Sequence, residues 1–415
     1  MRWSILSVAA LAVLGVARTD LKQQAKAAYE LEQYPNALRL ARQATKANPK
    51  DAEAWYLLGR YMHFRCYDSR PLAGFSRATS DSILGFLDRA VKLDPKLGDA
   101  FYFIGSEHGV RTHEPLVRGD VEQARAELRA ARTKGGYPDW MLEYCRNLLR
   151  VCERDAILFV MGDMQVNGVR YLQLVEGERP DVTALPYPLL DRPWAVLLYK
   201  DGIPGALRSA PMSWSREQVM DMHPYRWRTD TVRIPVPISA LTGMGITAPD
   251  TVFEWQVEPD LSNGERPMLS AITAAVIDIV EANNWSRPLY FALCPPAATA
   301  GIVSYLQSCG LAQRLLPVRT AQYGLALNTE VIRNVLLDPD SYRNLPSVRQ
   351  HDMPRVSGVL GMYRHGLIEL AAHYAETGRK AACDSVLDQM TVLLPESILP
   401  LQPELRAAVE RLRSR

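Results

Sequence analysis

Apolar residues along this chain follow three successive spacings. Up to about residue 153 they recur every three or four positions, which predicts amphipathic helices. Continuous apolar runs then alternate with helical segments, and the helical spacing returns near the C-terminus. We therefore expect an α/β plus α fold, in which helical hairpins flank a small parallel sheet. The expected parts are a helical region at 18–153, an α/β domain at 154–345 and a C-terminal helical hairpin at 346–415.

A repeat is visible in the first helical region. Trp55 and Phe101 open two similar apolar segments 46 residues apart, and Pro49 and Pro95 close successive units at the same offset. A tetratricopeptide unit has about 34 residues, so the offset corresponds to one unit with an insertion of about 12 residues, which we place between residues 61 and 82. The aromatic, Leu-Gly and terminal Pro positions resemble the tetratricopeptide pattern, and the expected C-terminal hairpin resembles it as well.

The middle of the chain predicts a Rossmann-like parallel sheet. The expected strands are 156–161, 181–185, 288–293 and 312–316, and the expected helices between them are 168–176, 270–281 and 299–307. Because strands and helices alternate, the sheet should be parallel and covered on both faces. Residues 201–265 are rich in Pro, Gly and Trp and predict an elaborated insertion, with an edge strand or hairpin at 253–257.

The first 17 residues have the pattern of a secretory signal peptide. Arg2 precedes an apolar run from Ile5 to Ala17 that ends in small residues. A bilayer-spanning helix needs about 20 apolar residues, so this run is short for a membrane anchor. We expect cleavage after residue 17 and export, with the periplasm as the destination. An uncleaved N-terminal anchor is the alternative.

Composition and charge exclude several classes of protein. The 415 residues include 48 Lys plus Arg and 46 Asp plus Glu, a formal charge of +2, so we expect no nucleic-acid partner. With 47% apolar and 23% charged residues, the composition is that of a globular protein without an integral membrane domain. Six cysteines are too few for a disulfide scaffold. Cys145 and Cys152 lie about 10.5 Å apart along one expected helix, further than a disulfide allows.

Polar residues at the strand ends are the candidate ligand-binding groups. In open α/β sheets, ligands bind beyond the carboxyl ends of the strands. Asp163, Gln165 and Asn167 follow the first expected strand, Asp191 follows the second, and Cys294 follows the third. The structural alternative is that Asp163 or Asn167 caps the next helix.

The sequence predicts no catalytic group, cofactor or metal site. It contains no Walker loop, no His-Glu-x-x-His helix and no Cys-x-x-Cys pair. His63 with Cys66, and His108 with His113, are pairs of potential metal ligands without further ligands nearby, so we expect them to pack or to face solvent. Four Trp residues between 190 and 260 could stack on sugars, although Trp more commonly packs in a core.

Several motifs resemble one family of large bacterial envelope proteins of unknown function. The segments that carry the resemblance are 158–182, 282–292 and 309–318, together with the final hairpin. They resemble the soluble C-terminal half of those proteins, whose multi-spanning half resembles protein O-mannosyltransferases. This sequence has helical repeats in place of that half, so glycosyl transfer is not implied. It also has Met161 and Gln165 where the family's strand-end loop usually has Asn and Asp.

Two functions follow from this organisation. The first is an exported tetratricopeptide-repeat interaction or scaffold protein of the cell envelope, which binds a protein partner through the groove of its helical repeats. The second is a glycan- or glycolipid-binding accessory protein or enzyme of envelope glycosylation, which uses the strand-end loops. The sequence shows no pattern typical of a nucleophile, a general-base pair or a metal cluster. We therefore favour the interaction or scaffold function.

Overall fold

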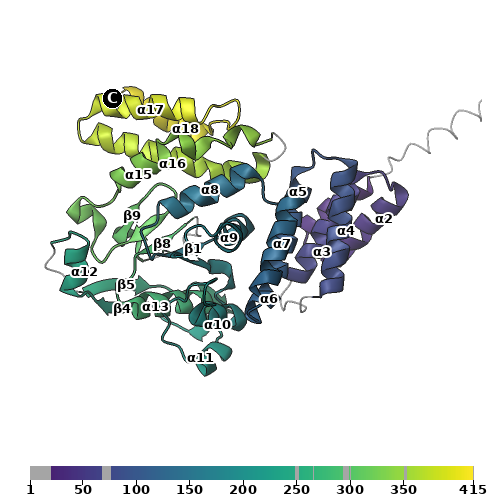
Figure 1. The fold of residues 1–415 in the computed structure, drawn as a ribbon, viewed down its shortest axis with the longest axis horizontal. Coiled ribbons are helices and arrows are strands. Elements are labelled where there is room, and N and C mark those ends of the chain that lie inside the picture. The colour runs from purple at the N-terminus through teal and green to yellow at the C-terminus, as the bar shows by residue number, and fades with distance from the viewer. Residues whose placement is uncertain are drawn as a thin grey trace, which may run out of the picture. The chain divides into compact units, whose positions relative to one another are not determined.

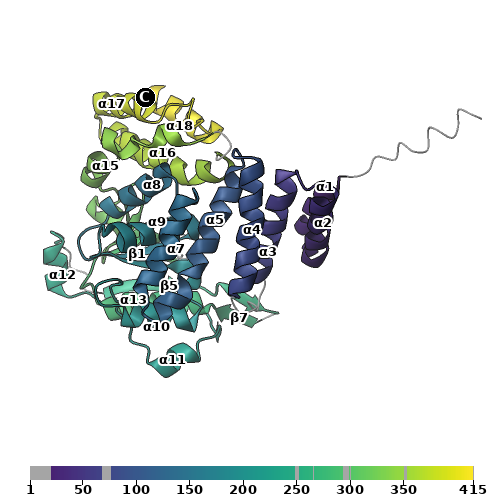
Figure 2. The same ribbon diagram turned by 45° about the vertical axis from the view of Figure 1, so that its right-hand side comes forward.

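A computed structural model describes residues 20–67, 76–247, 252–264, 266–292, 299, 301–349 and 353–414. The chain forms two compact units, Met1–Glu107 and His108–Arg415 (Figures 1 and 2). The expected signal peptide, at residues 1–17, and Cys294 lie outside the described residues.

The first unit consists of paired helices at the expected places. They are α1 (Leu21–Glu30), α2 (Tyr34–Ala47), α3 (Ala52–Tyr67), α4 (Arg77–Leu93) and the first turns of α5 (Gly98–Arg111). Helix α1 packs on α2, and α3 packs on α4. A Cβ atom on Gly59 would lie 2.8 Å from Leu87 Cδ2, so glycine permits the close approach of α3 and α4. The tetratricopeptide resemblance of these pairs remains a prediction.

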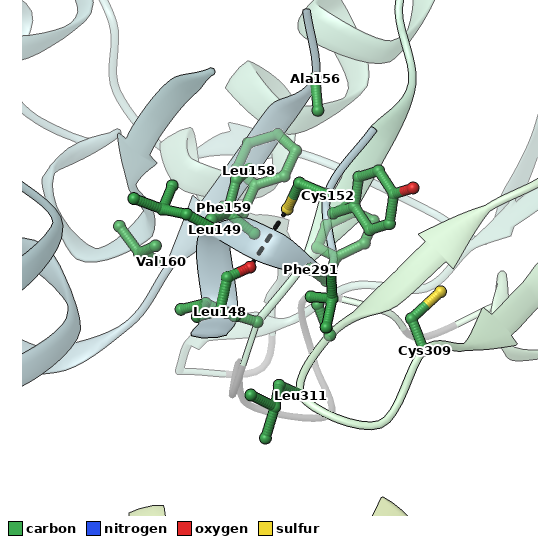
Figure 3. Packing of buried hydrophobic residues seen from close by; sticks show 14 of the residues in the cluster. Leu148, Leu149, Cys152, Ala156, Leu158, Phe159, Val160, Phe291, Cys309 and Leu311 are labelled. Atoms are coloured by element: carbon green, nitrogen blue, oxygen red, sulfur yellow. Dashed lines mark hydrogen bonds between the residues drawn. The ribbon is translucent and has the colours of Figure 1, made fainter. Parts of the chain in front are cut away.

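The second unit contains a five-stranded mixed sheet in the order β2-β1-β8-β10-β9. Its strands are β1 (Ile157–Val160), β2 (Thr183–Pro186), β8 (Leu289–Phe291), β9 (Leu306–Ser308) and β10 (Gln313–Leu315). Strand β1 pairs in parallel with both β2 and β8, and all its residues are buried, as its apolar run predicts. Phe159 and Phe291 are partners in this register, and their rings stack with centroids 4.9 Å apart (Figure 3).

The outer half of the sheet differs from the expectation. The strand expected at 312–316 is β10, which runs antiparallel to β8 and β9. The helix expected at 299–307 does not extend over that range: among the described residues Thr299 is helical, and a 3-10 turn (Val303–Tyr305) is followed by β9. Only four residues join β9 to β10, whereas a parallel connection needs a dozen or more. Gly310, at φ 83°, and a 2.9 Å hydrogen bond from Cys309 N–H to the Ala312 carbonyl close this turn.

Helices cover the sheet on two sides. In Figure 1, α8 (Asp139–Arg150) lies above the strands, and α10 (Pro193–Asp201) and α13 (Ala271–Asn283) lie below them. Helix α9 (Gly162–Tyr171) continues into a π-helical turn (Leu172–Glu176) that ends at Gly177, φ 70°. We expected the first domain to extend to residue 153. Helices α7 (Val121–Thr133) and α8 instead bury their apolar faces in the core of the sheet unit.

The Pro-, Gly- and Trp-rich insertion forms short antiparallel pairs. Strand β5 (Val252–Val257) pairs with β4 (Asp230–Pro235), and its side chains alternate between exposed and buried, as the 253–257 pattern predicts. Strand β7 (Arg266–Leu269) pairs with β3 (Tyr225–Arg226) and β6 (Leu261–Asn263). The short helices of this unit are α6 (His113–Val117), α11 (Arg216–Met220), α12 (Ile238–Gly243) and α15 (Thr329–Leu336).

The C-terminal helices pack on the sheet unit. They are α16 (Met353–Glu376), α17 (Lys380–Leu393) and α18 (Pro403–Ser414), which lie together beyond α8 and α15 in both views. Asn147 on α8 donates a 2.8 Å hydrogen bond to the Tyr363 hydroxyl on α16, and the Tyr144 and Tyr363 rings meet edge to face. Within the part of the chain that the structure describes, no helix combines the length and the apolar character needed to cross a bilayer.

Candidate functional site at the strand ends

Three of the four predicted site residues share helix α9, which starts earlier than expected. Gly162, at φ 72°, turns the chain directly from β1 into α9, so the helix begins at Gly162 and not near 168. Asp163 therefore lies in the first turn of α9, half-buried, and Asn167 lies inside the helix. Neither residue is the helix cap, because that position belongs to Met161. The capping interpretation of these two residues is wrong.

Gln165 and Asn167 face the protein interior. Gln165 is 1% exposed; its Oε1 accepts a 2.9 Å hydrogen bond from Met161 N–H, and its amide donates 3.3 Å to the Tyr144 hydroxyl. Asn167 is 4% exposed and lies directly against Gly109. A Cβ atom added to Gly109 would lie within 2.5 Å of the side-chain amide of Asn167. These two side chains support the packing of α9 on its neighbours.

The two carboxylates stand apart from this interior packing. No described side chain donates a hydrogen bond to Asp163. Asp191 follows β2 and forms a 3.2 Å ion pair with the adjacent Arg192. No hydrogen bond or ion pair between described residues joins Asp191 to α9. The predicted set is therefore divided into one half-buried carboxylate, two interior amides and one paired carboxylate.

A pocket that the sequence did not reveal lies further along the same sheet edge. Strand β9 runs parallel to β8, so Ser308, Phe291 and the start of β10 meet at the carboxyl edge of the sheet. Helix α16 closes the other side. We call this cavity the strand-end pocket; its volume is about 160 Å³. Its lining residues are Phe291, Ala292, Ser308, Gly310, Leu311, Ala312, Gln313, Met362, His365 and Glu369.

Two glycines form the contact that builds this pocket. A Cβ atom on Gly366 of α16 would lie 2.8 Å from the Gly310 Cα and 2.6 Å from Leu336 Cδ2. A Cβ atom on Gly310 would lie 2.8 Å from Leu336 Cδ2. Because both positions lack side chains, α16 rests on the β9–β10 turn and presents His365 and Glu369 to the pocket on either side of that contact.

The polar groups of the pocket can bind a ligand, but they do not form a nucleophilic relay. Ser308 donates its hydroxyl to Glu369 Oε2 at 2.5 Å, and Gly310 N–H donates to Ser308 Oγ at 3.4 Å. Within the described part of the chain no hydrogen bond joins Ser308 to His365, and the side chains of His365 and Gln313 have no hydrogen-bond partner. A nucleophilic relay needs a base that a third group orients, and among the described residues the Glu369 carboxylate is bonded to Ser308 alone, whereas binding needs only accessible donors and acceptors.

The floor of the pocket is apolar and continuous with the main core. Phe291 and Leu311, which line the pocket, belong to the same buried cluster as Cys309 and Cys152 (Figure 3). Burial raises the pKa of the Cys309 thiol to about 12 and also raises the pKa of Cys152. Cys145 and Cys152 are free and buried, as the spacing argument predicts. A buried thiol that stays protonated is a poor nucleophile or metal ligand.

Other candidate chemistry is explained by packing. His63 and His108 each bond a buried carboxylate at 2.8 Å, on Glu107 and Glu127 respectively. Arg287 donates to the carbonyls of Asp155, Ala156 and Ser209. Of the four Trp residues, Trp255 is buried in the core, and Trp194, Trp214 and Trp227 are partly buried against it.

The comparisons with known proteins concern the sheet unit. The family described as TMEM260-associated domain 2 matches residues 141–224 and 208–333, which together span less than half of the chain. The mouse protein O-mannosyl-transferase TMEM260 is 35% identical over 63 residues, which is 15% of this chain and 9% of the mouse protein. The matched span begins in α8 and ends in α15, so it includes all five strands of the main sheet. These similarities link residues 141–333 to the TMEM260 family.

Proposed function

We propose that this chain is an exported accessory protein of protein glycosylation, whose sheet unit binds a glycan or a glycosylated acceptor without transferring sugar itself. The observation that carries the proposal is the match of residues 141–333 to TMEM260-associated domain 2. That span contains the strand side of the strand-end pocket, from Phe291 to Gln313. The name of the mouse relative denotes mannosyl transfer to protein, and this chain shares less than a tenth of that protein's length.

A binding role fits the chemistry of the sheet edge better than a transfer role. Glycosyl transfer requires both a base and a leaving-group acid placed against the reacting atoms, and the described lining of the pocket contains one carboxylate, Glu369, which is bonded to Ser308. Accessible groups such as Glu369, His365 and Gln313 can instead exchange hydrogen bonds with sugar hydroxyls. This interpretation makes the glycan the ligand and assigns catalysis to a partner.

The helical units supply the protein-binding part of the proposal. The 46-residue offset between Trp55 and Phe101 corresponds to tetratricopeptide-like units, and stacked units of that kind present extended concave surfaces to protein partners. Export follows in this proposal from the apolar run at 5–17. The chain would then bring a glycosylated protein and a partner together in the periplasm.

The test is capture of glycoproteins by the purified chain. Tagged protein is incubated with an extract of its native envelope, and bound material is compared before and after enzymatic removal of O-linked sugars. We expect capture that depends on the sugar. Capture that survives deglycosylation would contradict the glycan proposal and favour the pure scaffold.

Asp163→Asn tests whether the sequence-predicted carboxylate contributes. The substitution keeps the shape of the side chain and removes only a charge near the N-terminus of α9, so we expect a stability change of about 1 kcal/mol or less. A loss of glycoprotein capture with unchanged folding would place Asp163 in the binding site. Unchanged capture would limit the site to the strand-end pocket.

A further inference from the structure

We infer that the strand-end pocket is a subsite for one neutral hexose unit and that it discriminates against phosphorylated sugar donors. This inference rests on the proposed function and adds the class of ligand. It assigns the direct contacts to Glu369, His365 and Gln313 on the polar side and to Phe291 and Met362 on the apolar side.

The size of the pocket sets the first limit on the ligand. Its volume is about 160 Å³, and on this measure one water molecule needs roughly 10–15 Å³. Drug-sized ligands occupy clefts of roughly 300–1,000 Å³. The pocket is therefore larger than a site for an isolated ion or water and smaller than the clefts of drug-sized ligands, a size that suits a single sugar ring.

The distribution of polar and apolar groups sets the second limit. Phe291, Leu311 and Met362 provide an apolar surface, which suits the C–H face of a pyranose. The carboxylate of Glu369 accepts hydrogen bonds, and the amide of Gln313 both donates and accepts. Glu369 Oε2 is already bonded to Ser308, which holds the carboxylate in place and leaves its second oxygen for the ligand. A ring with hydroxyls on one edge and C–H groups on one face matches this arrangement.

Charge sets the third limit. The described residues that line the pocket include Glu369 and no Lys or Arg. Apart from the imidazole of His365, a phosphate group would therefore meet a negative charge at short range with no permanently charged cation beside it, and like-charge juxtaposition opposes binding. Nucleotide-linked and lipid-phosphate-linked sugars both carry such groups. The pocket is accordingly suited to a sugar already attached to an acceptor and not to an activated donor.

The residues on the helix side of the pocket lie outside the span that matches the family. Phe291 to Gln313 lie within the span that matches TMEM260-associated domain 2, whereas Met362, His365 and Glu369 lie beyond its end at residue 333. Two of the three polar groups that would bind the sugar, His365 and Glu369, thus come from the C-terminal hairpin, whereas the matched sheet provides Gln313 and the apolar floor.

The experiment is a ligand-observed NMR titration of the full chain with methyl α-mannoside, methyl α-glucoside and mannose 6-phosphate. The variant Glu369→Gln keeps an oxygen that accepts the Ser308 hydroxyl and removes the charge. Glu376→Gln is the matched control, because Glu376 is exposed on the same helix and does not line the pocket. Circular dichroism confirms that each variant is folded.

We expect the wild type to bind a methyl hexoside at least tenfold more tightly than mannose 6-phosphate. Glu369→Gln should raise the Kd for the hexoside about tenfold, because a hydrogen bond to a charged group is lost. It should also reduce the difference in Kd between the hexoside and mannose 6-phosphate. Glu376→Gln should change neither value by more than about twofold. Equal effects of the two substitutions, or tighter binding of mannose 6-phosphate, would overturn the inference.

The two proposals fail in different ways. If the wild type captures glycoproteins in a sugar-dependent manner but no methyl hexoside binds, or Glu369→Gln binds normally, the pocket assignment is overturned and the accessory function stands. If sugar-dependent capture is absent, the accessory function is overturned whatever the titration gives.

Discussion

The contact between Gly366 and Gly310 provides a quantitative test of how the strand-end pocket is built. A Cβ atom at position 366 would lie 2.8 Å from the Gly310 Cα, a backbone atom that cannot rotate away. Gly358 lies in the same helix, is exposed, and would place a Cβ atom with nothing within 4 Å. Substitution of each glycine by Ala therefore applies the same change to two positions that differ in the space available.

The expected magnitudes follow from two opposing terms. Ala is favoured over Gly in a helix interior by roughly 0.5–1 kcal/mol, so Gly358→Ala should stabilise the protein by that amount. Gly366→Ala gains the same term, but overpacking typically costs about 1–3 kcal/mol. Since the helix term is common to both variants, the difference between them measures the overpacking alone, and we expect about 1–3 kcal/mol.

Thermal unfolding followed by circular dichroism gives the comparison. A change of 1 kcal/mol shifts the melting temperature by about 2–4 °C for a domain of 150–250 residues, so Gly366→Ala should melt a few degrees below Gly358→Ala. The same variant should weaken hexoside binding, because α16 must move away from the β9–β10 turn. Equal melting temperatures for the two variants would refute the assignment of Gly366 as the contact that builds the pocket.

Three further predictions concern the sheet edge and the core. Arg287→Lys loses the forked contacts to carbonyl groups and should lower the free energy of unfolding by roughly 2–4 kcal/mol. Denaturant unfolding measures this against the exposed control Arg228→Lys, and an equal loss in both variants would contradict the prediction. The hydrogen bond from Arg179 lowers the pKa of Asp181 to about 2, so its stabilising effect is complete above about pH 4 and is lost as pH falls toward 2. The melting difference between wild type and Asp181→Asn should shrink over that window, and a constant difference would refute the assignment. Cys145, Cys152, Cys309 and Cys383 are buried, so a thiol reagent should modify them only after unfolding; rapid modification of the folded Cys66→Ser, Cys294→Ser variant would contradict this.

The parallel half of the sheet, β2-β1-β8, was predictable because its strands are apolar and almost entirely buried. A run such as Ile157–Val160 has no polar position, so its pattern indicates a central strand flanked on both sides. The outer half was not predictable in the same way. Strands of three residues, such as β9 and β10, are too short to show a period, and their direction depends on the turn at Gly310.

Glycine caused the error at the start of α9. We expected a helix at 168–176, with Asp163 or Asn167 as its possible cap. In the structure Gly168 lies inside α9, where a Cβ atom would be 2.4 Å from the Cys145 sulfur on α8. Gly162, which does take a left-handed conformation, marks the true transition. Sequence alone shows both glycines but not which one has a neighbouring helix against it.

The strand-end pocket could not be predicted because its two sides are distant in the sequence. Ser308 and Glu369 are 61 residues apart and meet only because α16 returns to the sheet edge. His365 and Glu369 share a helix face at a four-residue spacing, which is a signal in the sequence, but the pattern is also typical of an exposed helix. A hydrogen-bonding group becomes a candidate ligand only when tertiary structure supplies the facing wall.

The sheet and helix α16 contribute differently to the specificity of the strand-end pocket. The floor of the strand-end pocket comes from strands whose apolar side chains also form the core, so Phe291 cannot change much without loss of stability. His365 and Glu369 are exposed on α16, and exposed substitutions away from special features usually alter stability by less than about 0.5 kcal/mol. The choice of ligand can therefore be altered through the C-terminal hairpin while the sheet stays intact. Exchanging Glu369 for Lys should convert a pocket for a neutral sugar into one that accepts a phosphorylated sugar, and mannose 6-phosphate titrated into that variant tests this; continued preference for the methyl hexoside would place selection elsewhere.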